Sequence, residues 1–121
     1  METDSGLIVY QIQDATVVTF QKTSVLDTLE VEQIGDTLYD LVDKRHCTKL
    51  VLDFSKVQLL SSSALGVLIT LRSKAAAIKG KAVICGIRDD LMKAFKITRL
   101  DKMFEFYDSE AKALASLGIK S

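Results

Sequence analysis

Short apolar runs and helix-like segments alternate along most of this chain of 121 residues. The runs at residues 50–54 and 82–87 are almost wholly apolar, which is typical of strands buried inside a sheet. Each run is followed by apolar side chains at helical spacing, over residues 64–78 and 91–97. Because strands joined through a helix lie parallel in one sheet, this alternation predicts helices packed on a partly parallel β-sheet.

The first third of the chain predicts a hairpin followed by a helix. Residues 7–13 and 16–20 are rich in β-branched and aromatic side chains, and the short break between them predicts an antiparallel pair of strands. A helix is expected to begin at Asp27 or Thr28, either of which can cap it. Apolar residues then recur at spacings of three to five, at Leu29, Ile34, Leu38, Leu41 and Val42.

Polar and glycine residues mark the boundaries of the later helices. The residues expected to begin these helices are the serines at 61–63, Asp89 or Asp90, and Asp108 or Ser109. Gly80 and Gly118 are expected to end the second and fourth helices. With a short strand at residues 104–107, the sequence predicts an α/β fold in one domain, residues 1–121, with a mixed sheet of about five strands and four helices packed mainly on one face.

Composition limits the classes of function. The 16 basic and 16 acidic residues cancel, which argues against a nucleic-acid partner and gives no support for binding an anionic membrane. No apolar run reaches the roughly 20 residues of a membrane span, and the polar first residues do not resemble a signal peptide. We therefore expect a cytoplasmic protein without membrane insertion, and near-neutral charge also allows a weak homodimer.

Residues suited to catalysis or metal binding are few. The two cysteines, Cys47 and Cys85, form no Cys-x-x-Cys pair, and the single histidine, His46, adds too few ligands for a metal site. No phosphate-binding glycine loop, dinucleotide-binding turn or nucleophile elbow is present. We expect no cofactor, no metal and no enzymatic activity.

The serines Ser61, Ser62 and Ser63 are the most informative feature that remains. They precede a predicted helix, whose first N–H groups and partial positive charge favour an anion such as a phosphate. A phosphoserine there would add about −1.5 to −2 charge without unfolding the helix. The simpler interpretation is that one serine only caps the helix and the others are exposed.

The residues around these serines resemble the core motif of the STAS domain family, which includes the anti-sigma factor antagonists. The family's Asp-Leu/Phe-Ser-x-Val stretch corresponds to residues 53–57, which read Asp-Phe-Ser-Lys-Val. Its Asp-Ser-Ser/Thr-Gly-Leu-Gly stretch corresponds to residues 61–66, which read Ser-Ser-Ser-Ala-Leu-Gly. The element order and the last helix also match, so the resemblance covers nearly the whole chain.

The resemblance implies a phosphorylation-controlled protein-binding domain. In such antagonists a partner anti-sigma factor, a serine kinase of the histidine-kinase-like ATPase type, phosphorylates the first serine after an acidic residue. That position is Ser62 here, with Ser63 as the second candidate. The implied partner-binding residues are Lys22, Thr23, Ser24, Ser61, Ser62, Ser63, Leu65 and Gly66.

Two departures from the motif keep alternatives open. Ser61 stands where the family has an acidic residue, and Ala64 stands where it has glycine. The missing carboxylate favours a second interpretation, a STAS scaffold or a subunit of a lipid-transport or signalling complex that works without phosphorylation. A third is an enzyme or a small-molecule sensor that uses the crevice at the strand ends.

Overall fold

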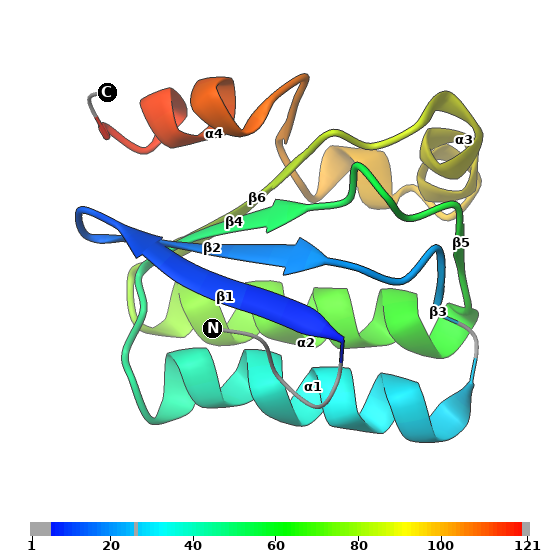
Figure 1. The fold of residues 1–121 in the computed structure, drawn as a ribbon, viewed down its shortest axis with the longest axis horizontal. Helices are drawn as coiled ribbons and strands as arrows, with labels where there is room; N and C mark the ends of the chain where they lie inside the picture. Colours follow the sequence, from blue (N-terminus) through cyan, green and yellow to red (C-terminus); the bar gives the residue numbers. More distant parts are fainter. Residues whose placement is uncertain (1–5, 26, 120–121) are drawn as a thin grey trace.

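The five-stranded mixed sheet predicted from the sequence is present. The computed structural model describes residues 6–25 and 27–119. The expectation about a signal peptide concerns residues 1–5, which lie outside the described residues. The strands lie in the order β1-β2-β4-β6-β7, and only β1 runs antiparallel to its neighbour (Figure 1). Their bounds are Leu7–Ile12 (β1), Ala15–Phe20 (β2), Lys49–Asp53 (β4), Lys81–Cys85 (β6) and Phe106–Tyr107 (β7).

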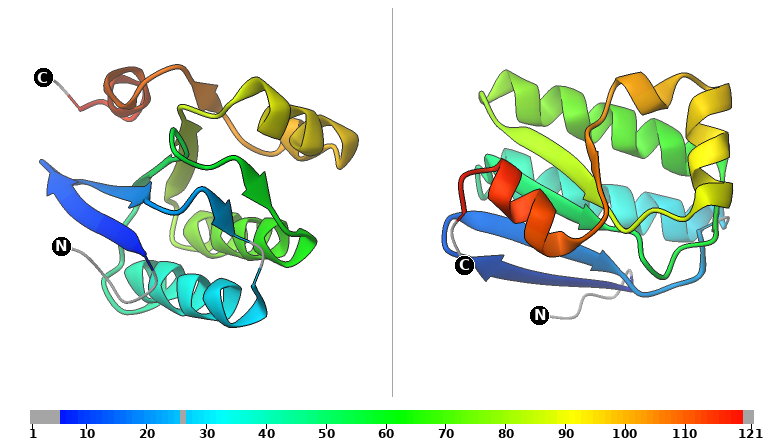
Figure 2. Two further views of the ribbon diagram at one scale, coloured as in Figure 1. Left: turned by 45° about the vertical axis from the view of Figure 1, so that its right-hand side comes forward. Right: turned by 90° about the horizontal axis from the view of Figure 1, so that it is seen from above.

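Four α-helices accompany the sheet, as predicted. They are α1 (Thr28–Asp43), α2 (Ser62–Ala77), α3 (Asp89–Ile97) and α4 (Glu110–Ser116), with a short 3-10 turn, η1 (Leu100–Lys102), after α3. Helices α1 and α2 lie side by side against one face of the sheet, and α4 lies over the opposite face (Figures 1 and 2). No helix within the described residues is long and apolar enough to cross a membrane.

Strand alternation divides the core between the two faces of the sheet. In β4, Leu50 and Leu52 point to the α1 and α2 side, and Val51 points to the α4 side. All three are fully buried, and each contributes roughly 1.5–3 kcal/mol through removal from water. The larger core lies under α1 and α2, and buried residues of α3 such as Phe95 extend it.

Most of the predicted helix caps are correct. The side chains of Asp27, Ser61 and Ser109 accept backbone N–H groups at the starts of α1, α2 and α4. The prediction for α3 is wrong, because Arg88 occupies its N-cap position and makes no side-chain cap hydrogen bond. Asp89 lies instead within the first turn, where the helix dipole still favours its charge.

Gly80 follows α2 as predicted, but for a different reason. The left-handed residue beyond this helix is Lys79, with φ of 62°. A Cβ atom on Gly80 would lie 2.7 Å from both the Cα and the carbonyl oxygen of Thr48. Glycine is therefore required here by the close approach of two backbone segments.

A second, two-stranded sheet was not predicted. Ser24–Val25 (β3) pairs in parallel with Leu59–Leu60 (β5), and neither segment was among the predicted strands. Two residues are too few to show a period of two, so only the tertiary contact reveals the pairing.

Candidate functional site

The predicted site residues gather where β2 and β4 end. The loop after β2 and the loop before α2 are joined through β3 and β5 (Figure 1). The N–H of Gln58 donates to the Thr23 carbonyl at 2.7 Å, and the N–H of Ser61 donates to the Val25 carbonyl at 3.0 Å. Lys22, Thr23 and Ser24 therefore lie beside the serine run. We call the surface formed by residues 22–25, 55–60 and 61–66 the serine end.

The motif at residues 53–57 anchors the serine end to the core. The Asp53 carboxylate accepts the N–H of Ser55 at 2.9 Å, which forms a tight turn at the end of β4. Phe54 is fully buried and meets the ring of Phe20 edge to face, with the centroids 4.6 Å apart. Gly86 has φ of 70°, and a Cβ there would lie 3.1 Å from the Ser55 Cβ. The turn that leads to the serines is therefore packed closely from both sides.

The three serines differ in what their hydroxyl groups do. Ser61 is half-buried and caps α2, since its Oγ accepts the N–H of Ala64 at 3.1 Å. Ser62 and Ser63 are exposed in the first turn of the helix. Serine and aspartate are about equally good N-caps. Ser61 therefore supports the helix as an acidic residue would, but brings no negative charge beside Ser62.

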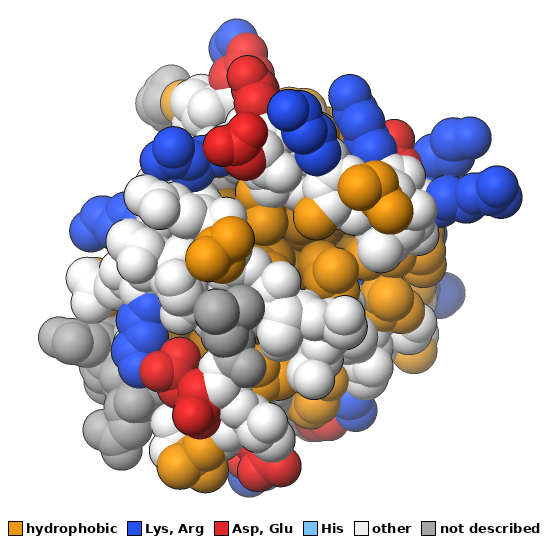
Figure 3. Space-filling model, turned by 90° about the vertical axis from the view of Figure 1, so that its right-hand side faces the viewer, with side chains coloured by type: hydrophobic (Ala, Val, Ile, Leu, Met, Phe, Trp, Pro, Cys, Tyr) orange, Lys and Arg blue, Asp and Glu red, His pale blue; other side chains and the backbone are white. Residues whose placement is uncertain are grey.

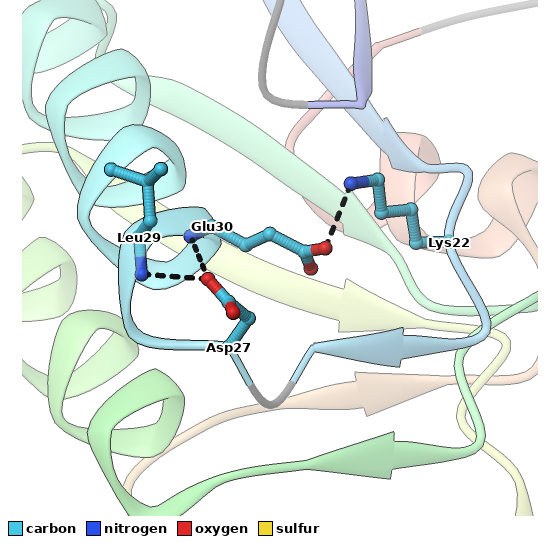
Figure 4. A network of polar contacts seen from close by, with 4 residues as sticks. All are labelled: Lys22, Asp27, Leu29 and Glu30. Atoms are coloured by element: carbon cyan, nitrogen blue, oxygen red, sulfur yellow. Dashed lines mark hydrogen bonds and ion pairs between the residues drawn. The ribbon is translucent and has the colours of Figure 1, made fainter.

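A small polar network joins the loop after β2 to α1 (Figure 4). The Lys22 ammonium forms an ion pair with the Glu30 carboxylate at 3.0 Å. Asp27 Oδ1 accepts the N–H groups of Leu29 at 2.9 Å and of Glu30 at 3.2 Å. Lys22, a predicted partner-binding residue, is thus already held by α1, whereas the Thr23 side chain is exposed.

The remaining predicted site residues lie at different depths. Leu65 packs in the core under α2, so its side chain has little surface to offer a partner. Gly66 is exposed, and a Cβ there would meet nothing within 4 Å. Of this pair, only Gly66 belongs to the accessible surface.

Sequence reasoning missed three exposed apolar side chains, one in the serine end and two in the neighbouring helices α1 and α3. Leu29 is 62% exposed and Ile97 83% exposed, although both had been expected on buried helix faces, and Leu59 is 54% exposed. Figure 3 looks onto this end and shows apolar side chains gathered in the middle, with lysine and arginine above, towards α3. Helical spacing did not separate these residues from the core, because exposure depends on where the neighbouring elements stop. A patch rimmed by polar residues is a common feature of protein-binding sites.

A separate group of polar side chains lies on the α4 side of the sheet. The Tyr10 hydroxyl donates to Glu110 Oε1 at 2.6 Å, and burial and this carboxylate raise the Tyr10 pKa well above its usual range. Burial also raises the pKa of the Cys85 thiol to about 12, with the charges of Asp53 and Glu110 adding to the effect. A thiol with this pKa stays protonated at neutral pH and is a poor nucleophile.

In the described part of the chain, no three His, Cys, Asp or Glu side chains gather to hold a metal ion.

Comparison with known proteins assigns a family to this arrangement. The model of a family described as the STAS domain matches residues 7–113. Among curated relatives, the anti-sigma F factor antagonist of Paenibacillus polymyxa is 24% identical over 96 residues, which cover 79% of this chain and 82% of the relative.

Solved structures share the fold at low sequence identity. An anti-sigma factor antagonist (STAS) domain protein from Planctomyces limnophilus is 21% identical and superposes with a TM-score of 0.80, over 91% of this chain and 95% of that one. The Bacillus cell fate determinant SpoIIAA in its phosphorylated form is 17% identical with a TM-score of 0.71, over 92% of this chain and 98% of that one.

Proposed function

The chain belongs to the STAS domain family, and we propose that it acts as an anti-sigma factor antagonist controlled by phosphorylation of Ser62. In this proposal the unmodified serine end binds an anti-sigma factor, which is also a serine kinase of the histidine-kinase-like ATPase type. Transfer of the ATP γ-phosphoryl group to the Ser62 hydroxyl then releases the partner. The name of the Paenibacillus relative and the phosphorylated form of the Bacillus protein support this assignment.

The exposure of Ser62 is the observation that carries the proposal. Its neighbour Ser61 is engaged in capping α2, while Ser62 is exposed at the start of the same helix. An exposed hydroxyl next to backbone N–H groups can be reached by a kinase and can hold a phosphate without loss of the helix. Modification is therefore expected to change the surface and to leave the fold intact.

The surroundings of Ser62 suggest how a phosphate would release a partner. Leu59 in β5 and Ile97 at the end of α3 are exposed apolar residues, and β5 and α3 lie at the same end of the molecule (Figure 1). A partner that covers this surface removes it from water. A dianionic phosphate within such a contact would have to lose its hydration, which weakens docking.

Phosphorylation by the histidine-kinase-like anti-sigma factor of the same organism tests the proposal. The protein is incubated with this kinase and ATP, and the modified residue is mapped by mass spectrometry. Ser62→Ala is expected to abolish modification, whereas Ser63→Ala, the matched control one residue along, is expected to keep it. Phosphate on Ser63, or normal modification of Ser62→Ala, would remove Ser62 from the mechanism.

Partner affinity provides the second test. Ser62→Asp is expected to weaken binding of the same anti-sigma factor by at least tenfold, as measured by calorimetry, while Tm stays within about 2 °C of wild type. Full affinity in this variant would contradict release by charge.

A second candidate function is a STAS scaffold that binds partners without phosphorylation. Ser61 in place of the family's acidic residue favours it, because the acceptor then lacks an adjacent negative charge. Affinity capture with the wild-type chain separates the two. Recovery of a histidine-kinase-like ATPase supports the antagonist, and recovery of a transporter ATPase supports the scaffold.

A further inference from the structure

A groove runs between α1 and α2 next to the serine run. The two helices lie side by side along the same face of the sheet (Figure 2). The groove between them has a volume of about 470 Å³ and reaches Ser63. It is lined by apolar and acidic residues, including Val31, Glu32, Gly35, Asp36, Tyr39 and Val67.

Gly35, which is one of the residues that line this groove, is not required by the packing of the two helices. Glycine is among the least favourable residues in the middle of a helix, and Gly35 lies in the middle of α1. A Cβ atom there would lie 3.5 Å from Tyr39 Cε2 and 3.5 Å from Val67 Cγ2, which is ordinary contact. Alanine would therefore fit and would favour the helix. What glycine provides is a hollow of about one methyl group in the lining of the groove, next to Tyr39 and Val67.

The acidic residues of the groove also destabilise the helix. Glu32 and Asp36 are exposed and lie one turn apart, where like charges repel. The other charged pairs of α1 join Glu30 to Lys22, Asp40 to Lys44 and Asp43 to Lys74. Among the described residues, neither Glu32 nor Asp36 has a cation within 4.0 Å. Two unfavourable features of α1, the glycine and the unpaired carboxylates, thus coincide at one groove.

We propose that this groove binds a basic amphipathic segment of a partner protein. An apolar side chain of that segment lies in the groove against Gly35, beside Val31, Tyr39 and Val67. Lysine or arginine side chains on either side of it pair with Glu32 and Asp36, the charges that the fold leaves without partners. The inference rests on the proposed function in taking the partner to be the one that docks at the serine end.

Selection from a displayed library of random 12-residue peptides tests the chemistry of this segment. Peptides are selected on the wild-type protein after depletion on the double variant Glu32→Lys with Asp36→Lys. We expect enriched peptides to carry lysine or arginine around a large apolar residue. Enrichment of neutral or acidic peptides, or of none, would overturn the proposal. No kinase or ATP is present, so failure here is distinct from failure of the phosphorylation mechanism.

A second measurement uses an enriched peptide labelled with fluorescein. Gly35→Ala is expected to raise Tm by about 2–5 °C, since alanine favours the helix, and to weaken peptide binding at least fivefold. Glu32→Gln with Asp36→Asn is expected to weaken binding about tenfold, with a smaller dependence on salt. Asp40→Asn, the matched control on the same helix outside the groove, should stay within twofold of wild type. Wild-type affinity in Gly35→Ala would overturn the role of the hollow.

Discussion

The two ends of the sheet are built differently. At the amino ends of the strands, ion pairs join neighbouring segments, with Lys49 to Asp14 at 2.8 Å and Lys81 to Glu105. At the carboxyl ends, where β5 and α3 lie (Figure 1), the large apolar side chains of Leu59 in β5 and Ile97 in α3 are exposed. Both ends thus carry ion pairs, and the carboxyl end also presents apolar surface to water.

The contacts at the amino end stabilise the fold, whereas the exposed surface at the serine end is available to a partner. Backbone contact at the amino end is close enough that Gly80 has no room for a Cβ beside Thr48. The serine end is held in place from beneath by Phe54, and by the Lys22–Glu30 ion pair at its side. The fold therefore holds the serine end in place and leaves its outer surface exposed.

The largest expected effect concerns the anchor of the serine end. Phe54→Ala removes a fully buried ring that contacts Phe20, and should lower the free energy of unfolding by about 3–5 kcal/mol. Urea denaturation followed by circular dichroism measures the loss. Phe54→Leu, which keeps most of the buried volume, should lose clearly less. A loss below about 1 kcal/mol in Phe54→Ala would show that the serine end is not held by the core.

A smaller loss is expected at the amino end, from Gly80→Ala. The added Cβ would meet the Thr48 backbone at 2.7 Å, which must shift, at a cost of about 1–3 kcal/mol in the free energy of unfolding. Affinity for the anti-sigma factor should stay within twofold. Gly35→Ala provides the opposite case, since it should stabilise the fold and weaken binding. If Gly80→Ala were as stable as wild type, the close approach of Gly80 to the Thr48 backbone would be disproved.

Elements with enough residues to show a period could be predicted from the sequence. Strands such as residues 50–54 and the hairpin have clear apolar patterns, and Ser61 was among the residues expected to cap α2. The pairing of β3 with β5 could not be predicted, because each contributes two residues and the contact is set by tertiary packing.

The candidate site was predictable only in part. The serine motif and the loop at residues 22–24 were both expected at the site, and the hydrogen bond from Gln58 to Thr23 brings them together. Exposure was not predictable, since Ile97 follows a helical pattern but lies beyond the cover of neighbouring elements. The hollow over Gly35 depends on how closely two helices approach, which no single sequence pattern expresses.

The exposed apolar surface should affect binding more than stability. Ile97→Ser changes a side chain that is 83% exposed, so the free energy of unfolding should move by less than about 0.5 kcal/mol. Affinity for the anti-sigma factor should fall about tenfold if Ile97 lies in the contact. Ala77→Ser, an exposed change at the opposite end of α2, is the control and should leave affinity unchanged. Equal affinity in both variants would place the docking surface elsewhere.

The smallest effect is expected from the ion pair between Lys81 and Glu105, and it should depend on pH. The Lys81 ammonium and the Tyr107 hydroxyl, which donates to Glu105 at 2.7 Å, lower the pKa of the Glu105 carboxyl. A lowered pKa in the folded state stabilises the protein above the unfolded pKa of about 4.5, and this contribution is lost as pH falls through the folded value. Because both side chains are about half exposed, Glu105→Gln should cost less than about 1 kcal/mol at pH 7, and this cost should shrink as the pH falls below 4.5. Urea denaturation of wild type and Glu105→Gln between pH 7 and pH 3 measures the difference in their free energies of unfolding. If this difference did not change with pH, packing rather than charge would make the contact between Lys81 and Glu105.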